Sequence, residues 1–403
     1  MGTPNKFVFV VCGAREHIDT LHFSLRYLKH FSKNDIIIVT DPTRNEIAIE
    51  HDSVVDVSTP EHFTHHQASI YLKTGLHKFL PKGFNYCYLD TDVVALTEEC
   101  DNIFAEKSGV VNFAPDHCRM PRFSPHAVKC DCLVQNRKEI AEIEALMEQY
   151  DPARKLKDPV MEKKKMNLIR KFEIMKQNKL SYALISLRFI TTLHKFKLDD
   201  DTYYDRWKKV WHDKEGRVII TPAESMVKDI EKNSQWRWNS FKRKWYGPDG
   251  KDIFNLECEH LPEYIHNRFD IDVRDKNFQH WNGGVFLFDD SSHDFLEAWF
   301  NKTMKIFEYK EWMTRDQGTL IATVWEFGLQ DNKMLPKKFN FIADWNNPRM
   351  MFDEQGNFTD DAFKTKVRPA FIHIYHNFGK KGWDVWDYVE NIQSAFSGPP
   401  VKA

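Results

Sequence analysis

Two aspartates separated by one residue follow a short apolar run in the first quarter of the chain. Asp90 and Asp92 lie in YLDTDVVA (88–95), and NYCYL (85–89) has the apolar pattern of a buried strand. Ligands of open α/β sheets bind at the carboxyl ends of the strands, so both carboxylates would face a crevice. Oxygen ligands at this spacing suit a hard divalent cation, with diphosphate oxygens completing its shell. Alone the motif is weakly specific, because acids also end strands as turn residues.

A second motif, HWNGGVFLFD (280–289), places an amide and two glycines before an apolar run. Asn282 offers both a donor and an acceptor to a sugar hydroxyl, and Gly283 and Gly284 let a bulky ligand approach the backbone closely. The alternative interpretation is a tight turn. Further along, RDQGTL (315–320) opens a helical pattern.

The last motif is HIYHNFGKKGW (373–383). A neutral imidazole such as that of His376 can bind a divalent metal, and Gly379, Lys380 and Lys381 suit a phosphate-binding turn. The alternative for His376 is a structural histidine near a strand end.

The elements around these motifs alternate between short apolar runs and amphipathic helical patterns, which is typical of parallel βαβ units. The first part contains strand patterns at 7–11, 35–39, 85–89 and 109–113 and helical patterns at 18–31 and 63–80. After a highly charged middle region, the pattern returns at 283–288, 294–307, 315–325 and 370–376. We therefore expect an α/β core over 1–135 and 263–395 and a flexible tail at 396–403. Residues 136–262 would form an inserted, largely helical subdomain with a β-hairpin, whose turn is Pro-Asp-Gly at 248–250, and would be a candidate acceptor-binding region or lid.

The composition is typical of a folded protein, and the nearly balanced charges give the chain no strong overall electrostatic field. The 403 residues allow one elaborated domain or two to three ordinary ones. Lys and Arg total 57 against 59 for Asp and Glu, so nucleic acid or a membrane would have to bind a local patch. We expect no nucleic-acid partner.

Two observations favour a cytoplasmic location. The longest purely apolar stretch near the N-terminus, 7–12, is too short for a membrane span or a signal-peptide core. The seven cysteines are an odd number and are scattered, unlike a secreted disulfide framework. Whether the natural protein has a membrane anchor is left open.

Taken together, the Asp-x-Asp, Asn-Gly-Gly, Asp-Gln-Gly and His-x-x-Gly-x-Lys motifs resemble, in type and order, those of the glycogenin-like family of retaining glycosyltransferases, which is family 8-like and has the GT-A fold. APD (114–116) and LPKKFNF (335–341) are also similar to the family's connecting segments. The resemblance covers 6–125 and 275–385. It implies a metal-dependent hexosyltransferase that uses a UDP-sugar donor and a glycan, protein or lipid-linked acceptor, with retention of anomeric configuration.

The resemblance also implies roles for individual residues. Mn²⁺ (or Mg²⁺) would be held by Asp90, Asp92 and His376. The terminal motif is one residue shorter than the family's, so His373 stays a possible substitute ligand and the phosphate lysine is either Lys380 or Lys381. The remaining donor-binding residues would be Val11, Cys12, Gly13, Lys73, Asn282, Gly283, Gly284 and Gly379.

Asp316 and Gln317 would face the anomeric carbon. The divalent ion and lysines would stabilise the charge that develops on the departing diphosphate. Front-face attack and double displacement, with Asp316 or Gln317 as nucleophile, are both left open.

The inserted region carries two ambiguous features. The basic amphipathic stretch 154–179, with Met161, Leu168, Phe172 and Met175 on one stripe, is either a core-facing helix or a peripheral contact with an anionic membrane. An aromatic cluster is either a sugar-stacking surface or a small core; it consists of Trp236, Trp238, Trp245 and Tyr246.

A group of nitrogen and sulfur ligands near the insertion is either a zinc site or a set of loop thiols; it comprises His117, Cys118, His126, Cys130 and Cys132.

Two other functions compete. DTDVV (90–94) fits the nucleophile motif of haloacid-dehalogenase-type phosphatases, with Asp90 as nucleophile and LFDD (287–290) as the terminal acidic motif. A non-catalytic carbohydrate-binding protein on the same scaffold is the third class. The sequence does not specify the donor sugar, the acceptor or the oligomeric state.

Overall fold

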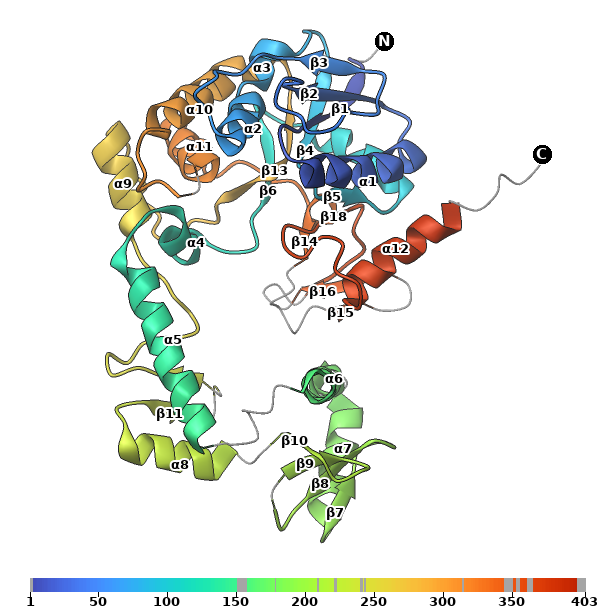
Figure 1. Cartoon of the computed structure of the whole chain (residues 1–403), viewed down its shortest axis with the longest axis vertical. Helices are drawn as coiled ribbons and strands as arrows, with labels where there is room; N and C mark the ends of the chain where they lie inside the picture. Colours follow the sequence, from blue (N-terminus) through green and yellow to red (C-terminus); the bar gives the residue numbers. More distant parts are fainter. Residues whose placement is uncertain are drawn as a thin grey trace, which may run out of the picture. The chain divides into compact units, whose positions relative to one another are not determined.

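A computed structural model describes residues 3–150, 158–177, 179–208, 210–220, 223–239, 242, 244–313, 315–343, 351–352, 356–360 and 365–396. The chain divides into two compact units (Figure 1). Unit 1 comprises Met1–Cys130 and Glu257–Ala403, and unit 2 comprises Asp131–Leu256. These boundaries lie five and six residues before the expected ones at 135/136 and 262/263.

Unit 1 is built on a six-stranded, mostly parallel sheet, which confirms the expected α/β fold class. Its strand order is β3-β2-β1-β4-β13-β6. The strands are β1 (Asn5–Val10), β2 (Asp35–Thr40), β3 (Val54–Asp56), β4 (Asn85–Leu89), β6 (Asn112–Pro115) and β13 (Trp281–Phe288). β1 pairs in parallel with β2 on one side and β4 on the other, whereas β13 is antiparallel to β4 and β6.

Alternate side chains of the central strands enter two different cores, because successive residues of a strand point to opposite faces. In β1, Phe7 and Phe9 join one core, and Val8 and Val10 join the other. All four are buried. The sheet is therefore covered on both faces, as its nearly continuous apolar strands predict.

Helices cover the two faces (Figure 1). The first core includes residues of α1 (Arg15–Phe31) and α12 (Asp384–Phe396). The second includes residues of α2 (His65–Thr74), α3 (Leu76–Phe79), α4 (Met120–Ala127), α9 (His260–Phe269), α10 (His293–Ile306) and α11 (Arg315–Glu326). The expected helix over 63–80 is thus two helices that meet at Gly75, the C-cap of α2.

A smaller sheet beside the first core has the order β14-β18-β5. It consists of β5 (Val93–Ala95), β14 (Phe341–Ile342) and β18 (Phe371–His373). β18 is antiparallel to β5, and His373 is opposite Val93. This pairing brings the C-terminal region to the residues that follow β4.

The remaining elements of unit 1 are short. They are the 3₁₀ helices η1 (Glu98–Glu106), η3 (Asp290–Ser292) and η4 (Lys337–Phe339), and the strands β15 (Met351–Phe352), β16 (Phe358–Asp360) and β17 (Thr365–Val367). Of the expected tail at 396–403, only residue 396 is among the described residues.

Unit 2 contains more β structure than the expected largely helical insertion. Its helices are α5 (Asp131–Tyr150), α6 (Pro159–Gln177), α7 (Lys179–Thr191) and α8 (Ala223–Asn233). They accompany a four-stranded antiparallel sheet of order β10-β9-β8-β7 and a hairpin of β11 (Arg237–Asn239) and β12 (Lys244–Tyr246). The sheet strands are β7 (Lys195–Lys197), β8 (Thr202–Asp205), β9 (Val210–Asp213) and β10 (Val218–Ile220).

Both ambiguous apolar features of the insertion are at least partly structural. Leu168 of α6 is 1% exposed, and Phe172 packs edge-on against Trp211 of β9 with ring centroids 5.2 Å apart. The stripe of α6 therefore faces the sheet of unit 2. Trp236 and Trp245 are 1% and 3% exposed and belong to a small core with residues of α5 and α8.

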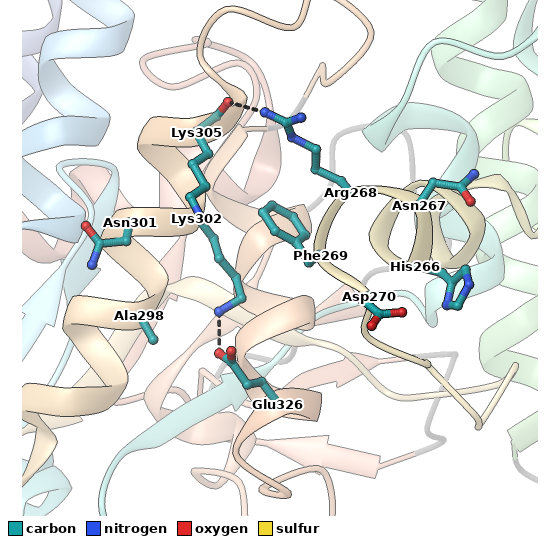
Figure 2. Close-up of a pocket in the computed structure, with 10 residues that line it drawn as sticks. All are labelled: His266, Asn267, Arg268, Phe269, Asp270, Ala298, Asn301, Lys302, Lys305 and Glu326. Atoms are coloured by element: carbon teal, nitrogen blue, oxygen red, sulfur yellow. Dashed lines mark hydrogen bonds and ion pairs between the residues drawn. The ribbon is translucent and has the colours of Figure 1, made fainter.

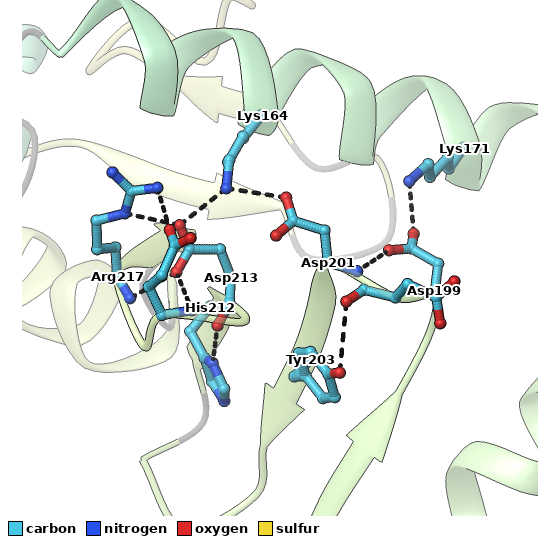
Figure 3. A network of polar contacts seen from close by, with 10 residues as sticks. Lys164, Lys171, Asp199, Asp201, Tyr203, His212, Asp213 and Arg217 are labelled. Atoms are coloured by element: carbon cyan, nitrogen blue, oxygen red, sulfur yellow. Dashed lines mark hydrogen bonds and ion pairs between the residues drawn. The ribbon is translucent and has the colours of Figure 1, made fainter.

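An ionic network joins α6 to this sheet (Figure 3). Asp213 is fully buried, and its Oδ2 lies 2.9 Å from Lys164 Nζ and 2.8 Å from Arg217 Nε. Its Oδ1 accepts hydrogen bonds from the backbone N–H groups of Glu215 and Arg217 at 3.0 and 2.9 Å. These bonds, led by that from Lys164, outweigh the effect of burial and hold the pKa of Asp213 at about 2.

Across the described part of the chain, no helix combines the length and the apolar character needed to cross a lipid bilayer.

Candidate active site

Asp90 and Asp92 occupy the turn between β4 and β5, at the carboxyl end of β4. The backbone N–H of Asp90 donates to Gly284 O at 2.8 Å, and the N–H of Val93 donates to Asp90 O at 3.0 Å. The hydroxyl of Tyr88 donates to Asp90 Oδ1 at 2.5 Å. The two carboxylates keep 29% and 26% of their side-chain surface exposed, so a ligand from solution can reach them.

His373 completes a three-residue group with these aspartates. One potential ligand atom of each of Asp90, Asp92 and His373 lies within 4.8 Å of the others, and His373 Nε2 is 3.3 Å from Asp92 Oδ1. Burial lowers the pKa of His373, but the charge of Asp92, the hydrogen bond to Asp92 and the charge of Asp90 together raise it above its ordinary value.

His376, which the resemblance named as the metal ligand, lies outside this group. It is exposed in the turn after β18, and its ring contacts Tyr375. The physical reason is the register of β18, which ends at His373 opposite Val93, so that His376 is three residues beyond the paired segment. Of the two histidines that the sequence left open as ligands, the structure places His373, and not His376, beside the two aspartates.

A series of hydrogen bonds between buried side chains orients His373 on the side of its ring away from Asp92. Its Nδ1 is 3.0 Å from Asn340 Oδ1, and Asn340 Nδ2 donates to Asn282 Oδ1 at 3.0 Å. Asn282 Nδ2 in turn donates to Asp116 Oδ2 at 2.9 Å. Because Asn340 presents its oxygen, the proton of a neutral His373 belongs on Nδ1, which leaves the Nε2 lone pair facing Asp92.

Lys73 joins the first aspartate to the motif on α11. Its ammonium nitrogen lies 3.1 Å from Asp90 Oδ1 and 3.1 Å from Asp316 Oδ2. The side chain is 10% exposed, and although burial lowers its pKa, the charges of Asp90 and Asp316 raise it above the ordinary value. Lys73 therefore supplies a fixed positive charge at the edge of the aspartate pair.

The two glycines of the second motif lie against these groups for different steric reasons. A Cβ at Gly284 would stand 2.5 Å from His373 Cε1 and 2.9 Å from Asp90 Oδ2, so no larger residue fits there without moving them. A Cβ at Gly283 would stand 3.4 Å from Lys73 Nζ, which is nearly ordinary contact. The amide of Gln317 contacts Gly283, in an orientation that accepts from Gly283 N at 3.2 Å and donates to Trp281 O at 3.1 Å.

The arrangement fits a divalent cation. Asp90, Asp92 and Asp316 carry three negative charges against one positive charge on Lys73, leaving a balance of two when His373 is neutral. Two carboxylates and an imidazole oriented by an amide oxygen are suitable ligands for Mn²⁺, and carboxylates also suit Mg²⁺. The Gly284 backbone leaves room for these ligands that a side chain would fill.

The end of β1 forms a neighbouring tight turn. Val11 and Cys12 are buried, and burial raises the pKa of the Cys12 thiol to about 11. Gly13 has φ +106°, and a Cβ there would overlap His65 Nδ1 at 2.2 Å. This turn and the Asp90 turn follow adjacent parallel strands, β1 and β4, at the point where the strand order changes direction. Such switch points are where open α/β sheets bind ligands.

The residues Gly379, Lys380 and Lys381 lie in an exposed turn between β18 and α12. Gly379 has φ +79°, and Phe378 packs on Phe23 of α1 and Trp386 of α12. The turn is therefore anchored beside α1 rather than in the Asp90 group.

Asp116 and Asn340 are site residues that sequence reasoning did not assign. Asp116 is buried; burial raises its pKa, but the charge of His280 and hydrogen bonds from His117 and Asn282 lower it by more. The only signal in the sequence was that both residues lie in the APD (114–116) and LPKKFNF (335–341) segments. Asn340 orients His373 through a contact between residues more than thirty positions apart in the sequence, which local patterns do not predict.

A surface hollow elsewhere in unit 1 contains none of these residues. Figure 2 shows its lining from α9 to α11, with Arg268 donating to the backbone oxygen of Lys305 and Lys302 paired with Glu326. Its lining includes His266, Asp270 and Glu326, but within the described residues none of these belongs to a group that could hold a metal ion. The candidate site is therefore the Asp90 group.

No protein-family model matches the chain, and no curated protein matches its sequence. Similar structures include the galactosyltransferase LgtC in complex with donor and acceptor sugar analogues, at 9% identity over 96% of this chain and 95% of that chain, TM-score 0.41. Mouse xyloside xylosyltransferase 1 is 11% identical over 93% of this chain and 98% of that chain, TM-score 0.36. The bifunctional glycosyltransferase WbbM is 13% identical over 97% of this chain and 49% of that chain, TM-score 0.39. Because each TM-score is below 0.5, the reaction is inferred from the site itself.

Proposed function

We propose that the protein is a metal-dependent glycosyltransferase of GT-A architecture that transfers a hexose from a UDP-sugar, with retention of configuration. The observation that carries the proposal is the convergence of Asp90, Asp92 and His373 at the carboxyl end of β4, beside Lys73 and the open Gly284 backbone. A divalent ion held there would face the switch-point crevice, where a nucleotide diphosphate can reach it.

Asp90, Asp92 and His373 would hold Mn²⁺ or Mg²⁺, whose charge stabilises the diphosphate leaving group. Lys73 lies between Asp90 and Asp316, within reach of the same ligand, and would contact a donor phosphate or sugar oxygen. Asn340 keeps the proton of His373 on Nδ1, so that Nε2 remains available as a ligand. The turn at Val11, Cys12 and Gly13 would bind the uridine.

The reacting carbon would lie near the start of α11. Asp316 and Gln317 are in its first turn, against Lys73 and Gly283. In the reaction the bond from the anomeric carbon to the diphosphate oxygen breaks and a bond to an acceptor oxygen forms. The acceptor proton passes to the departing diphosphate in front-face attack. In double displacement, Asp316 or Gln317 would first bond to the anomeric carbon as the bond to the diphosphate breaks. The acceptor oxygen would then displace that side chain from the anomeric carbon and give its proton to the diphosphate. The acceptor would be a glycan, a protein or a lipid-linked sugar, and the inserted unit 2 is a candidate for acceptor binding.

The geometry argues against the phosphatase alternative. β13 is antiparallel to β4, with Phe288 opposite Tyr86, so the acidic pair that follows β13 lies at the amino end of β4. There Asp289 caps η3 and Asp290 accepts from Gly83 N at 2.9 Å. This pair cannot complete a phosphatase site around Asp90, which is at the opposite end of the strand.

A thermal-shift titration tests the proposal. We expect Mn²⁺ with UDP or a UDP-sugar to raise the Tm of the wild type, because a ligand that binds only the native state stabilises it by mass action. Asp92→Asn should lose the shift, and His376→Ala, the matched control outside the group, should keep it. Release of UDP from the sugar that gives the largest shift then separates an enzyme from a non-catalytic binding protein. Stabilisation by Mg²⁺ with a phosphate mimic, and by no nucleotide, would contradict the proposal.

A further inference from the structure

A second group of ligands lies in the segments that lead into α5 and α9, apart from the carboxylate site. Cys130, Cys132, Cys258 and His260 each place one sulfur or ring nitrogen within 4.8 Å of the others. The first two residues flank Asp131, the first residue of α5, and the other two flank Glu259, the N-cap of α9. Only Cys130 and Cys132 belong to the ligand group noted in the sequence; Cys118 lies instead with Asp116 and His280.

The backbone on both sides of the group is fixed by hydrogen bonds within the fold. The N–H of Cys258 donates to Pro121 O at 3.0 Å, and the N–H of Leu261 donates to the buried Ser124 Oγ at 2.9 Å. The N–H of Lys129 donates to Glu311 O at 2.7 Å. The two ligand pairs are therefore held together by α4 and its neighbours before any ion binds.

Such a gathering of thiols has little stabilising value without an ion. None of the three cysteines is in a disulfide, and Cys258 Sγ lies 3.2 Å from Ser124 Oγ. S–H groups are weak donors and weak acceptors, so such contacts stabilise the group little. Each of the four side chains is half-buried, so the group is partly shielded from solvent. Four ligands around one tetrahedral zinc ion, with Zn–S near 2.3 Å, lie about 3.8 Å from one another. The four ligand atoms lie within 4.8 Å of one another, so they need to move only slightly closer together to reach that geometry.

We propose that Cys130, Cys132, Cys258 and His260 bind one structural zinc ion. Three thiolates and an imidazole favour zinc over the oxygen-seeking Mn²⁺ and Mg²⁺. With four protein ligands the shell is closed, so the ion holds structure and leaves no position for substrate. It joins the segment after α4 to the first turn of α9. The one-residue spacing of both pairs departs from the common C-x₂₋₄-C pattern, which explains why the sequence alone does not show the site.

Metal analysis of the full-length protein tests this site without reference to activity. Protein purified without a metal-affinity step should contain about one zinc ion per chain. Cobalt substituted for the zinc should give the visible bands of a tetrahedral ion and the thiolate-to-cobalt charge-transfer band. The charge-transfer band requires sulfur ligands and cannot come from cobalt bound to Asp90, Asp92 and His373.

Cys258→Ser and Cys130→Ser should lose the stoichiometric zinc and the charge-transfer band. Cys118→Ser is the matched control, because its thiol belongs to the other ligand group, and it should keep both. If the serine variants do not fold, the wild-type zinc content and cobalt spectrum still decide the question. The proposal is overturned by wild-type protein that lacks zinc and gives no thiolate band on cobalt, by a disulfide among these cysteines in titration of the denatured, unreduced protein, or by loss of the zinc only in Cys118→Ser.

Discussion

Gly284 is the residue whose size matters most to the proposed metal site. A methyl group there would press on His373, Asn282 and Asp90 at 2.5 to 2.9 Å, closer than real Cβ contacts. Neither Asn282 nor His373 can move easily, because Asn340 hydrogen-bonds to both. The close approach of β13 to the aspartate turn therefore depends on the absence of a side chain.

We expect Gly284→Ala to weaken Mn²⁺ binding at least about 10-fold. Mutations that disturb the residues orienting metal ligands typically lower metal affinity about 10- to 100-fold. Gly283→Ala is the control, since its methyl group would meet Lys73 only at 3.4 Å. It should keep Mn²⁺ affinity within about 3-fold of the wild type, a small effect on this scale. Calorimetric titration with Mn²⁺ checks both values. Equal loss in the two variants would argue against the steric account.

Asn340 contributes through His373. Asn340→Leu removes the oxygen that accepts from His373 Nδ1 while keeping a similar volume, so we expect Mn²⁺ affinity to fall about 10- to 100-fold. Asn45→Leu is a comparison outside the group, because Asn45 bonds to Gly13 and Thr40. It should leave Mn²⁺ affinity unchanged even if nucleotide binding suffers. Unchanged Mn²⁺ affinity in Asn340→Leu would remove Asn340 from the account.

At the scale of elements, the short sheet β14-β18-β5 decides which histidine meets the aspartates. The sequence predicted β4 with its observed bounds and helical patterns that match α1, α2 with α3, α10 and α11, because those patterns are local, but it did not predict α4, α9 or α12. It could not predict that β18 ends at His373 or that this residue is opposite Val93, because a three-residue strand leaves too little pattern to define its register. Hence the sequence predicted Asp90, Asp92 and Lys73 at one place but left the choice between His373 and His376 open, and the structure places His373 beside the two aspartates.

A β-hairpin was expected in the insertion, but the four strands of the sheet in unit 2 were missed, for a related reason. Each of β7 to β10 is three or four residues long, and polar residues interrupt the apolar alternation. Their arrangement depends on tertiary contacts such as the Asp213 network, which joins residues from α6 and the β9 end.

That network gives a prediction of pH-dependent stability. The folded-state pKa of Asp213 is lowered to about 2, so its charge stabilises the fold above the unfolded pKa of about 3.9 and this contribution is lost as pH falls toward 2. Asp213→Asn should lower the free energy of unfolding of unit 2 by about 1–3 kcal/mol at pH 7. The difference from the wild type should shrink between about pH 4 and 2 in urea unfolding.

Asp200→Asn provides the control, because Asp200 is fully exposed and pairs only at the surface with Lys197. Its effect on the free energy of unfolding should stay within the error of the measurement at every pH. A pH-independent difference for Asp213→Asn would contradict the electrostatic account.

At the scale of the whole molecule, the β1–β4 switch point collects motifs from both ends of the sequence. The uncompensated negative charge there predicts that metal removal destabilises unit 1. We expect Mn²⁺ at 100 times its Kd to add about 2.7 kcal/mol to the stability of EDTA-treated protein. The combined variant Asp90→Asn, Asp92→Asn should be insensitive to Mn²⁺ in the same unfolding experiment, and an equal Mn²⁺ effect in that variant would place the ion elsewhere.

The most direct test of the central claim is an electron paramagnetic resonance titration of Mn²⁺ against the protein, with and without UDP. The account predicts one site per chain that UDP tightens, that His373→Ala weakens at least about 10-fold, and that His376→Ala leaves intact. Loss of the site in His376→Ala with retention in His373→Ala, or Mn²⁺ binding that UDP does not affect, would contradict it.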